Sequence, residues 1–168
     1  QMCIRDRLTT MLKVQPDQLA ERVGKLAADL KDAERRLAQA RTKELFAQVD
    51  QIVETMAPAG KFDLVSAKVP GVTGGDLRSL ATQIRSKIAE RPAVVVLIGG
   101  TDDKPAMIVA TTESARVAGA KAGALIKVGI SRLDGRGGGK DDMAQGAGSN
   151  ASGVDDALST VASELSAL

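Results

Sequence analysis

The sequence contains no histidine, tryptophan or tyrosine, and its only aromatic residues are Phe46 and Phe62. Without histidine, the chain lacks the commonest general base and the commonest metal ligand of proteins. Its single cysteine, Cys3, excludes an internal disulfide and a zinc site of the CxxC type. The core must therefore be built from alanine, valine, leucine and isoleucine. These bury less area per residue than aromatic side chains, so we expect self-association to add stability.

Long apolar runs are absent as well. The longest spans only residues 93–100, whereas a membrane-spanning helix needs about 20 apolar residues. No stretch resembles a signal peptide. We therefore expect a cytoplasmic protein without a membrane partner.

The first seven residues, QMCIRDR, have neither helical nor strand periodicity. We interpret residues 1–7 as a non-native tail. We also expect the N-terminal part of a longer protein to be missing from this chain.

A heptad pattern follows this segment. Apolar residues recur at spacings of four and three from Leu19 onward, slip by one position after Ala40, and continue to Met56, with charged residues and glutamine between them. The pattern predicts a coiled-coil-type helix over 17–56, about 60 Å long, within an oligomerisation segment 8–58. An alternative is that the helix folds back on its own domain and covers part of the stripe. The candidate dimerisation residues are Leu19, Val23, Leu26, Leu30 and Leu37.

Residues 60–168 are expected to form a globular α+β domain, a small sheet covered by helices. Its predicted order is β-α-β-β-α-loop-α, with the second and third strands joined as a hairpin. The predicted elements are a strand over 62–69, a helix that starts near Asp76 and stops before Pro92, strands over 93–100 and 106–112, a helix over 113–133 and a last helix from Ser152.

Positive charge is concentrated late in the chain. The net charge is only +2, but residues 116–140 carry six basic residues against one acidic residue, a local net charge of +5. Such a stripe favours a polyanionic partner, although a solvated helix face would have the same composition.

One face of the predicted helix 113–133 combines charge with small residues. At 100° per residue, Arg116 and Lys127 lie within about 20° of each other, near Gly119 and Gly123. A phosphate backbone can approach such a face closely. The glycines equally suit tight packing of the helix on the sheet, so both interpretations stay open.

The segment LDGRGGGKDDMAQGAGS, residues 133–149, is too polar and too rich in glycine to build a core. It is not a Walker loop, because Asp134 stands where that motif needs glycine and Lys140 is followed by aspartate. It is not a dinucleotide-binding fingerprint, since it follows a helix. Three consecutive glycines allow positive φ angles and outward N–H groups, with Arg136 and Lys140 on either side.

Asp141 and Asp142 are the only carboxylates in this segment that are adjacent to each other. Neighbouring carboxylates point in different directions, so we expect solvated charges that balance nearby bases and predict no metal site.

The stretch GISRLDGRGGGKDDMAQGAG, residues 129–148, resembles the C-terminal signature of bacterial alanine–tRNA ligases. In that signature a triple glycine, a basic residue, an acidic residue and Met-Ala-Gln recur. The resemblance extends over residues 68–88, 93–100 and 113–127 and back along the long helix, so that it covers 8–168. Family members often have Arg-Pro-Asp where this chain has Lys-Asp-Asp, which keeps the base but loses the rigid proline.

The resemblance implies a dimerising helix followed by a DHH-associated domain that binds the elbow of tRNA(Ala) and links aminoacylation to editing. ATP and zinc belong to upstream domains in that family, so this fragment is expected to need no cofactor and to be inactive alone. The candidate tRNA-binding residues are Arg116, Lys127, Arg132, Arg136, Gly137, Gly138, Gly139, Lys140 and Gln145.

Two other functions remain open. A DHH-type phosphoesterase carries a related substrate-binding domain, but usually has histidine after the triple glycine, where this chain has Lys140. A pure oligomerisation module would have the same long helix and would need no basic stripe.

Overall fold

The computed structural model describes residues 4–13, 15–101 and 103–168, and the chain divides into two compact units, Gln1–Glu44 and Leu45–Leu168. The first unit contains α1 (Ile4–Leu12) and most of α2 (Leu19–Ala47). Residues 4–7 lie in α1, although their sequence has no helical periodicity, and the rest of the expected tail is outside the described residues.

The long helix is shorter than predicted. α2 has 29 residues, about 43 Å at 1.5 Å per residue, and after Gln48 the chain continues as α3 (Val49–Glu54). The prediction of one helix over 17–56 is therefore wrong. Val49 and Ile52, which continue the apolar pattern after its slip, belong to α3 and are buried in the sheet's core.

The apolar stripe of α2 faces solvent along most of its length. Val23, Leu26, Leu30 and Leu37 have exposed fractions between 39% and 61%, and Leu19 is half-buried. Most of the polar positions described in this helix are exposed as well, although Arg22 and Asp32 are half-buried. Within the described residues, α2 therefore buries little of its apolar face.

The second unit is built on a mixed sheet of strand order β1-β2-β3-β4-β6-β5. Only β2 and β3 are parallel, and α4 (Gly74–Lys87) joins them; every other neighbouring pair is antiparallel. The strands are β1 (Ala57–Ala59), β2 (Phe62–Pro70), β3 (Ala93–Thr101), β4 (Lys104–Thr111), β5 (Arg136–Gly139) and β6 (Met143–Ala147).

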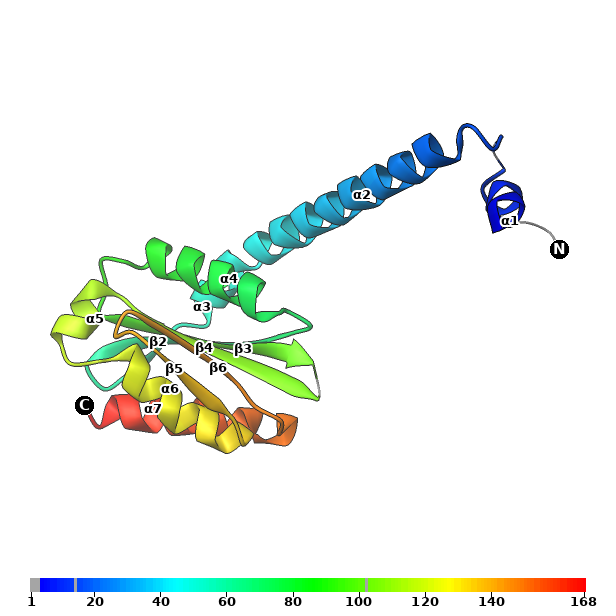
Figure 1. Cartoon of the computed structure of the whole chain (residues 1–168). Coiled ribbons are helices and arrows are strands. Elements are labelled where there is room, and N and C mark those ends of the chain that lie inside the picture. The colour runs from blue at the N-terminus through cyan, green and yellow to red at the C-terminus, as the bar shows by residue number, and fades with distance from the viewer. Residues whose placement is uncertain (1–3, 14, 102) are drawn as a thin grey trace. The chain divides into compact units, whose positions relative to one another are not determined.

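Helices cover both faces of this sheet, as Figure 1 shows. Side chains alternate along β3, so that Val94 and Val96 pack under α6 and α7 while Val95 and Leu97 pack under α3 and α4. This alternation explains why β3 is apolar without interruption: both of its faces are buried. The predicted α+β fold is confirmed.

The prediction of one helix over 113–133 is wrong. This segment forms two helices, α5 (Glu113–Val117) and α6 (Ala122–Ile130), followed by the 3₁₀ turn η1 (Ser131–Leu133). Gly119, with φ of 106°, ends α5 in a Schellman motif. Its N–H bonds to the Arg116 carbonyl, and the Ala120 N–H bonds to the Ala115 carbonyl. Arg116 and Lys127 therefore do not share a helix face.

The prediction of a loop before the last helix is also wrong, since part of that segment forms the β5–β6 hairpin at one edge of the sheet. β6 pairs with β4, so the hairpin extends the sheet instead of crossing its surface. The chain then runs through the 3₁₀ turn η2 (Ala151–Gly153) into α7 (Val154–Ser166). None of the described helices is long and apolar enough to cross a membrane.

Candidate nucleic-acid interface

A groove of about 540 Å³ lies between α4 and the β5–β6 hairpin. Three of its lining residues are cationic and one is anionic, so the groove carries a net positive charge. From α4 it is lined by Arg78, Thr82 and Arg85, and from the hairpin by Gly138, Gly139, Lys140, Asp142, Met143 and Gln145.

The helical wall of the groove follows from the amphipathic pattern of α4. Leu77, Leu80 and Ile84 are buried against the sheet. Arg78 and Arg85 are seven residues apart and therefore lie together on another face of the helix. Neither arginine is among the residues predicted from the sequence to bind RNA. Their signal was a basic face on an otherwise ordinary amphipathic helix.

Arg85 is held in place by the hairpin. Its Nη1 donates to the Asp142 carbonyl oxygen at 3.2 Å and lies 3.5 Å from the Asp142 Oδ2. Only 26% of the Arg85 side chain is exposed. The shorter contact is to the carbonyl, so the backbone fixes the guanidinium, and N–H groups remain for a ligand.

The three glycines of β5 have different surroundings. A Cβ on Gly139 would lie 2.5 Å from the Ala144 Cα, and one on Gly137 would lie 2.9 Å from the Gly146 Cα. A Cβ on Gly138 would meet nothing within 4 Å. The expected positive φ angles are not found here, because all three glycines lie in a strand. Their close packing explains the glycines at 137 and 139 but not the one at 138.

Helix α6 approaches this strand closely. A Cβ on Gly123 would lie 3.2 Å from the Gly139 carbonyl oxygen. Of the two interpretations of the helical glycines, packing is therefore correct for Gly123, and the helix end accounts for Gly119.

The structure brings together some of the predicted site residues. Gly138, Gly139, Lys140 and Gln145 line the groove. Arg116 lines an adjoining hollow of about 280 Å³ that shares Arg85 and Asp142 with the groove. The Arg116 guanidinium donates to the Thr111 carbonyl at 3.2 Å.

Other predicted residues lie outside the groove. Lys127 is exposed on α6 and Arg132 is exposed in η1, while Gly137 lies on the face of β5 that packs toward α6. Arg136 is exposed on β5 and, two positions from Gly138, points to the same face of the sheet as that glycine.

The two adjacent aspartates contact different cations. Asp141 lies 3.6 Å from the Lys121 Nζ, and Asp142 pairs with Arg85. In the described part of the chain, no group of three or more histidine, cysteine, aspartate or glutamate side chains is placed to hold a metal ion.

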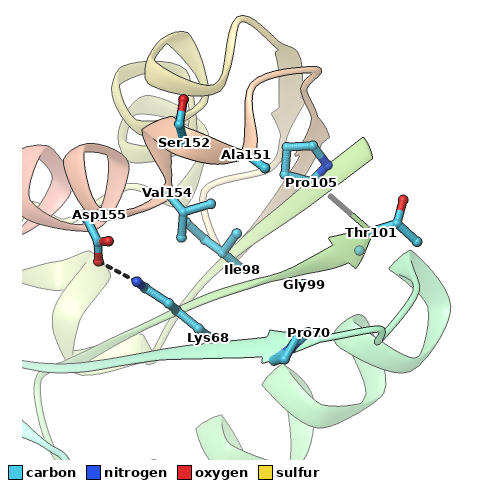
Figure 2. Close-up of a pocket in the computed structure, with 11 residues that line it drawn as sticks. Lys68, Pro70, Ile98, Gly99, Thr101, Pro105, Ala151, Ser152, Val154 and Asp155 are labelled. Carbon is cyan, nitrogen blue, oxygen red and sulfur yellow. Dashed lines mark ion pairs between the residues drawn. The ribbon is translucent and has the colours of Figure 1, made fainter. Parts of the chain in front are cut away.

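A second hollow, of about 310 Å³, lies where β2 and β3 end beside the start of α7 (Figure 2). Its cation, Lys68, forms an ion pair with Asp155, in the first turn of α7. That carboxylate neutralises the lysine and would repel an anion. None of the residues predicted to bind RNA lines this hollow, so the groove beside α4 is the candidate site.

Comparison with known proteins identifies the family to which this chain belongs. A family model for the DHHA1 domain matches residues 62–167. The alanine–tRNA ligase of Cutibacterium acnes is 71% identical over 163 residues, which are 97% of this chain and 18% of that protein. The alanine–tRNA ligase of a Nocardioides species is 38% identical, over 95% of this chain and 18% of that protein. This chain therefore spans less than a fifth of the length of these relatives.

Among solved structures, the C-Ala domain of Aquifex aeolicus alanyl-tRNA synthetase matches with a TM-score of 0.61 and 25% identity, over 67% of this chain and 98% of that one. RecJ of Thermus thermophilus matches with a TM-score of 0.56 and 17% identity, over 92% of this chain and 21% of that one. The second likeness concerns the fold alone.

Proposed function

The chain belongs to the DHHA1 domain family, and from this membership we propose that it binds tRNA(Ala) and dimerises as the C-terminal part of an alanine–tRNA ligase. The whole enzyme would attach alanine to tRNA(Ala) with ATP in the cytoplasm, and this part would hold the tRNA elbow and link aminoacylation to editing. The high identity to a curated alanine–tRNA ligase supports the proposal. One observation carries it: the glycine signature of the sequence forms one wall of a basic groove.

The charge of the groove suits a phosphate backbone. Arg78 and Lys140 have no ion-pair partner among the described residues, and only Arg85 is partly neutralised. Cations without partners gain from phosphate contacts, because binding releases the counterions that surround the RNA. Arg136 lies on the same face of the sheet and would extend the contact beyond the groove.

A folded tRNA is much larger than the groove. Since α6 packs against β5, Lys127 and Arg132 lie on elements that adjoin the same sheet edge. We keep both as candidates for outer contacts of the RNA, and Arg116 as a candidate in the adjoining hollow.

Dimerisation is assigned to α2. The large apolar side chains at Val23, Leu26, Leu30 and Leu37 follow heptad spacing and are exposed in the single chain. A second copy of the helix would cover them, and Leu19 would continue the same seam.

The RNA-binding test measures the affinity of the chain for a tRNA(Ala) transcript at several salt concentrations. If four phosphates are contacted, the logarithm of the binding constant should fall by about 3 for each tenfold increase in salt. The double substitution Arg136→Ala/Lys140→Ala should weaken binding and reduce this slope by about 1.5. A matched pair, Lys61→Ala/Lys104→Ala, removes the same charge from exposed positions outside the groove and should leave the slope unchanged.

Light scattering on the same variants separates the two roles. The Arg136→Ala/Lys140→Ala variant should remain a dimer, because the dimer seam is assigned to α2. Loss of the dimer would instead assign the hairpin to the subunit interface. If the unaltered chain binds tRNA(Ala) without salt dependence, or not at all, RNA binding is refuted and an oligomerisation module remains.

A further inference from the structure

The groove between α4 and the hairpin has the size of a small-ligand site. Its volume of about 540 Å³ falls within the range of roughly 300–1,000 Å³ that is typical of such pockets. A double helix could lie across this groove but could not enter it. A single nucleotide whose base is unpaired could enter.

The glycine at position 138 leaves the hairpin wall of the groove open. Packing demands glycine at 137 and 139, but a Cβ at 138 would meet no atom within 4 Å. A side chain there would project into the groove, on the same face of the sheet as Gln145. The absence of a side chain therefore leaves space for a ligand and adds nothing to the packing of the hairpin.

The walls offer contacts for both parts of a nucleotide. The guanidinium groups of Arg78 and Arg85 bind phosphate and can stack on a base. Gln145 has an amide that can both donate to and accept from a base edge, and the structure gives this amide no partner among the described residues. The thioether of Met143 supplies an apolar contact.

The shortage of aromatic residues shapes this recognition. Unpaired bases usually stack on aromatic side chains, but neither Phe46 nor Phe62 lines the groove, and Phe62 is only 2% exposed. The uncharged or cationic planar groups that remain in the groove are the two guanidinium groups and the amide of Gln145.

We propose that this groove receives one unpaired nucleotide of the bound RNA, with its phosphate at Arg78 and Arg85 and its base over Gly138. The inference rests on the proposed function in so far as RNA reaches this face of the sheet. It adds that the site selects unpaired nucleotides and is more than a charged surface.

The test compares two RNA probes by fluorescence anisotropy: a labelled 12-nucleotide strand without internal pairing, and the same strand annealed to its complement. The duplex has twice the phosphates, so attraction by charge alone would make the duplex bind more tightly. The proposal expects the single strand to bind at least fivefold more tightly than the duplex.

Two variants locate the binding. Gly138→Val should weaken single-strand binding about tenfold or more and leave duplex binding unchanged. Ala57→Val, at an exposed position in the strand at the opposite edge of the sheet, is the matched control and should bind both probes normally. Arg78→Lys keeps the charge but loses the planar group, and should still weaken single-strand binding severalfold.

The outcomes are distinguishable from those of the tRNA test. If the duplex binds as tightly as the single strand, or if Gly138→Val binds both probes normally while its melting temperature is unchanged, the nucleotide site is refuted even where tRNA(Ala) binds with the expected salt slope. If the groove binds the single strand as described but tRNA(Ala) does not bind, the tRNA assignment fails and the nucleotide site stands.

Discussion

Replacing the three glycines of β5 by alanine, one at a time, should destabilise the protein in a fixed order. Gly139→Ala should be the most harmful, because the new Cβ would lie 2.5 Å from both the Ala144 Cα and the Met143 carbonyl oxygen. Gly137→Ala should be intermediate, with its closest approach at 2.9 Å to the Gly146 Cα. Gly138→Ala should not destabilise the protein at all.

The magnitudes follow from what each Cβ would meet. At Gly139 the two closest neighbours are backbone atoms and the third is the Ala144 Cβ. None of these atoms can rotate away, and overpacking of this kind costs about 1–3 kcal/mol. At Gly138 the strand conformation suits alanine, and loss of glycine's freedom in the unfolded chain adds about 0.4–1 kcal/mol of stability. For a chain of this length, each kcal/mol shifts the melting temperature by about 2–4 °C. We therefore expect a fall of about 2–12 °C for Gly139→Ala and a rise of about 1–4 °C for Gly138→Ala.

Thermal unfolding followed by circular dichroism measures these shifts. In urea unfolding, an unchanged dependence of the unfolding free energy on urea concentration would show that each variant exposes the same surface area on unfolding. Equal losses at positions 138 and 139 would refute the reasoning, because the two sites differ only in their surroundings. In that case Gly138 would also be a packing residue, and no ligand would be needed to explain a glycine at this position.

Two further predictions concern charge and domain limits. Asp142→Asn should tighten tRNA(Ala) binding about two- to fivefold in the same salt titration. The reason is that the Arg85 guanidinium keeps its backbone carbonyl partner and loses a competing carboxylate. The control Asp141→Asn removes the same charge outside the groove and should have a smaller effect. A chain that begins at Leu45 should be monomeric by light scattering and should fold with α3 and β1 intact. A chain that begins at Gly60 lacks two buried apolar side chains of α3. This loss lowers the free energy of unfolding by up to about 3–6 kcal/mol, so the shorter chain should unfold at a lower temperature.

Strands and helices with strong side-chain patterns could be predicted from the sequence. The apolar run at 93–100 and the turn after it gave β3 and β4, and the apolar face of α4 gave that helix. The β5–β6 hairpin could not be predicted in the same way. Glycine has low strand propensity and no alternating side chains, so its pairing depends on β6 and on the close approach of α6.

The break between α5 and α6 did leave a local signal. Gly119 stands two residues after the last residue of α5, where a helix-ending glycine belongs, and the basic spacing of Arg116 and Lys127 obscured it. The groove itself had no such signal. Arg85 and Asp142 are 57 residues apart, and only the folded sheet brings them into contact.

The edges of the sheet have a consequence for assembly. A dimer would keep two sheets at high local concentration, and an exposed edge strand is a template for pairing with another chain. Here one edge is β1, three residues long with Pro58 at its centre, and the other is β5, four residues long with one arginine and three glycines. Short strands that contain proline, glycine or a charged side chain pair poorly. In a dimer, the glycines of β5 would therefore also protect the two subunits from joining edge to edge and aggregating.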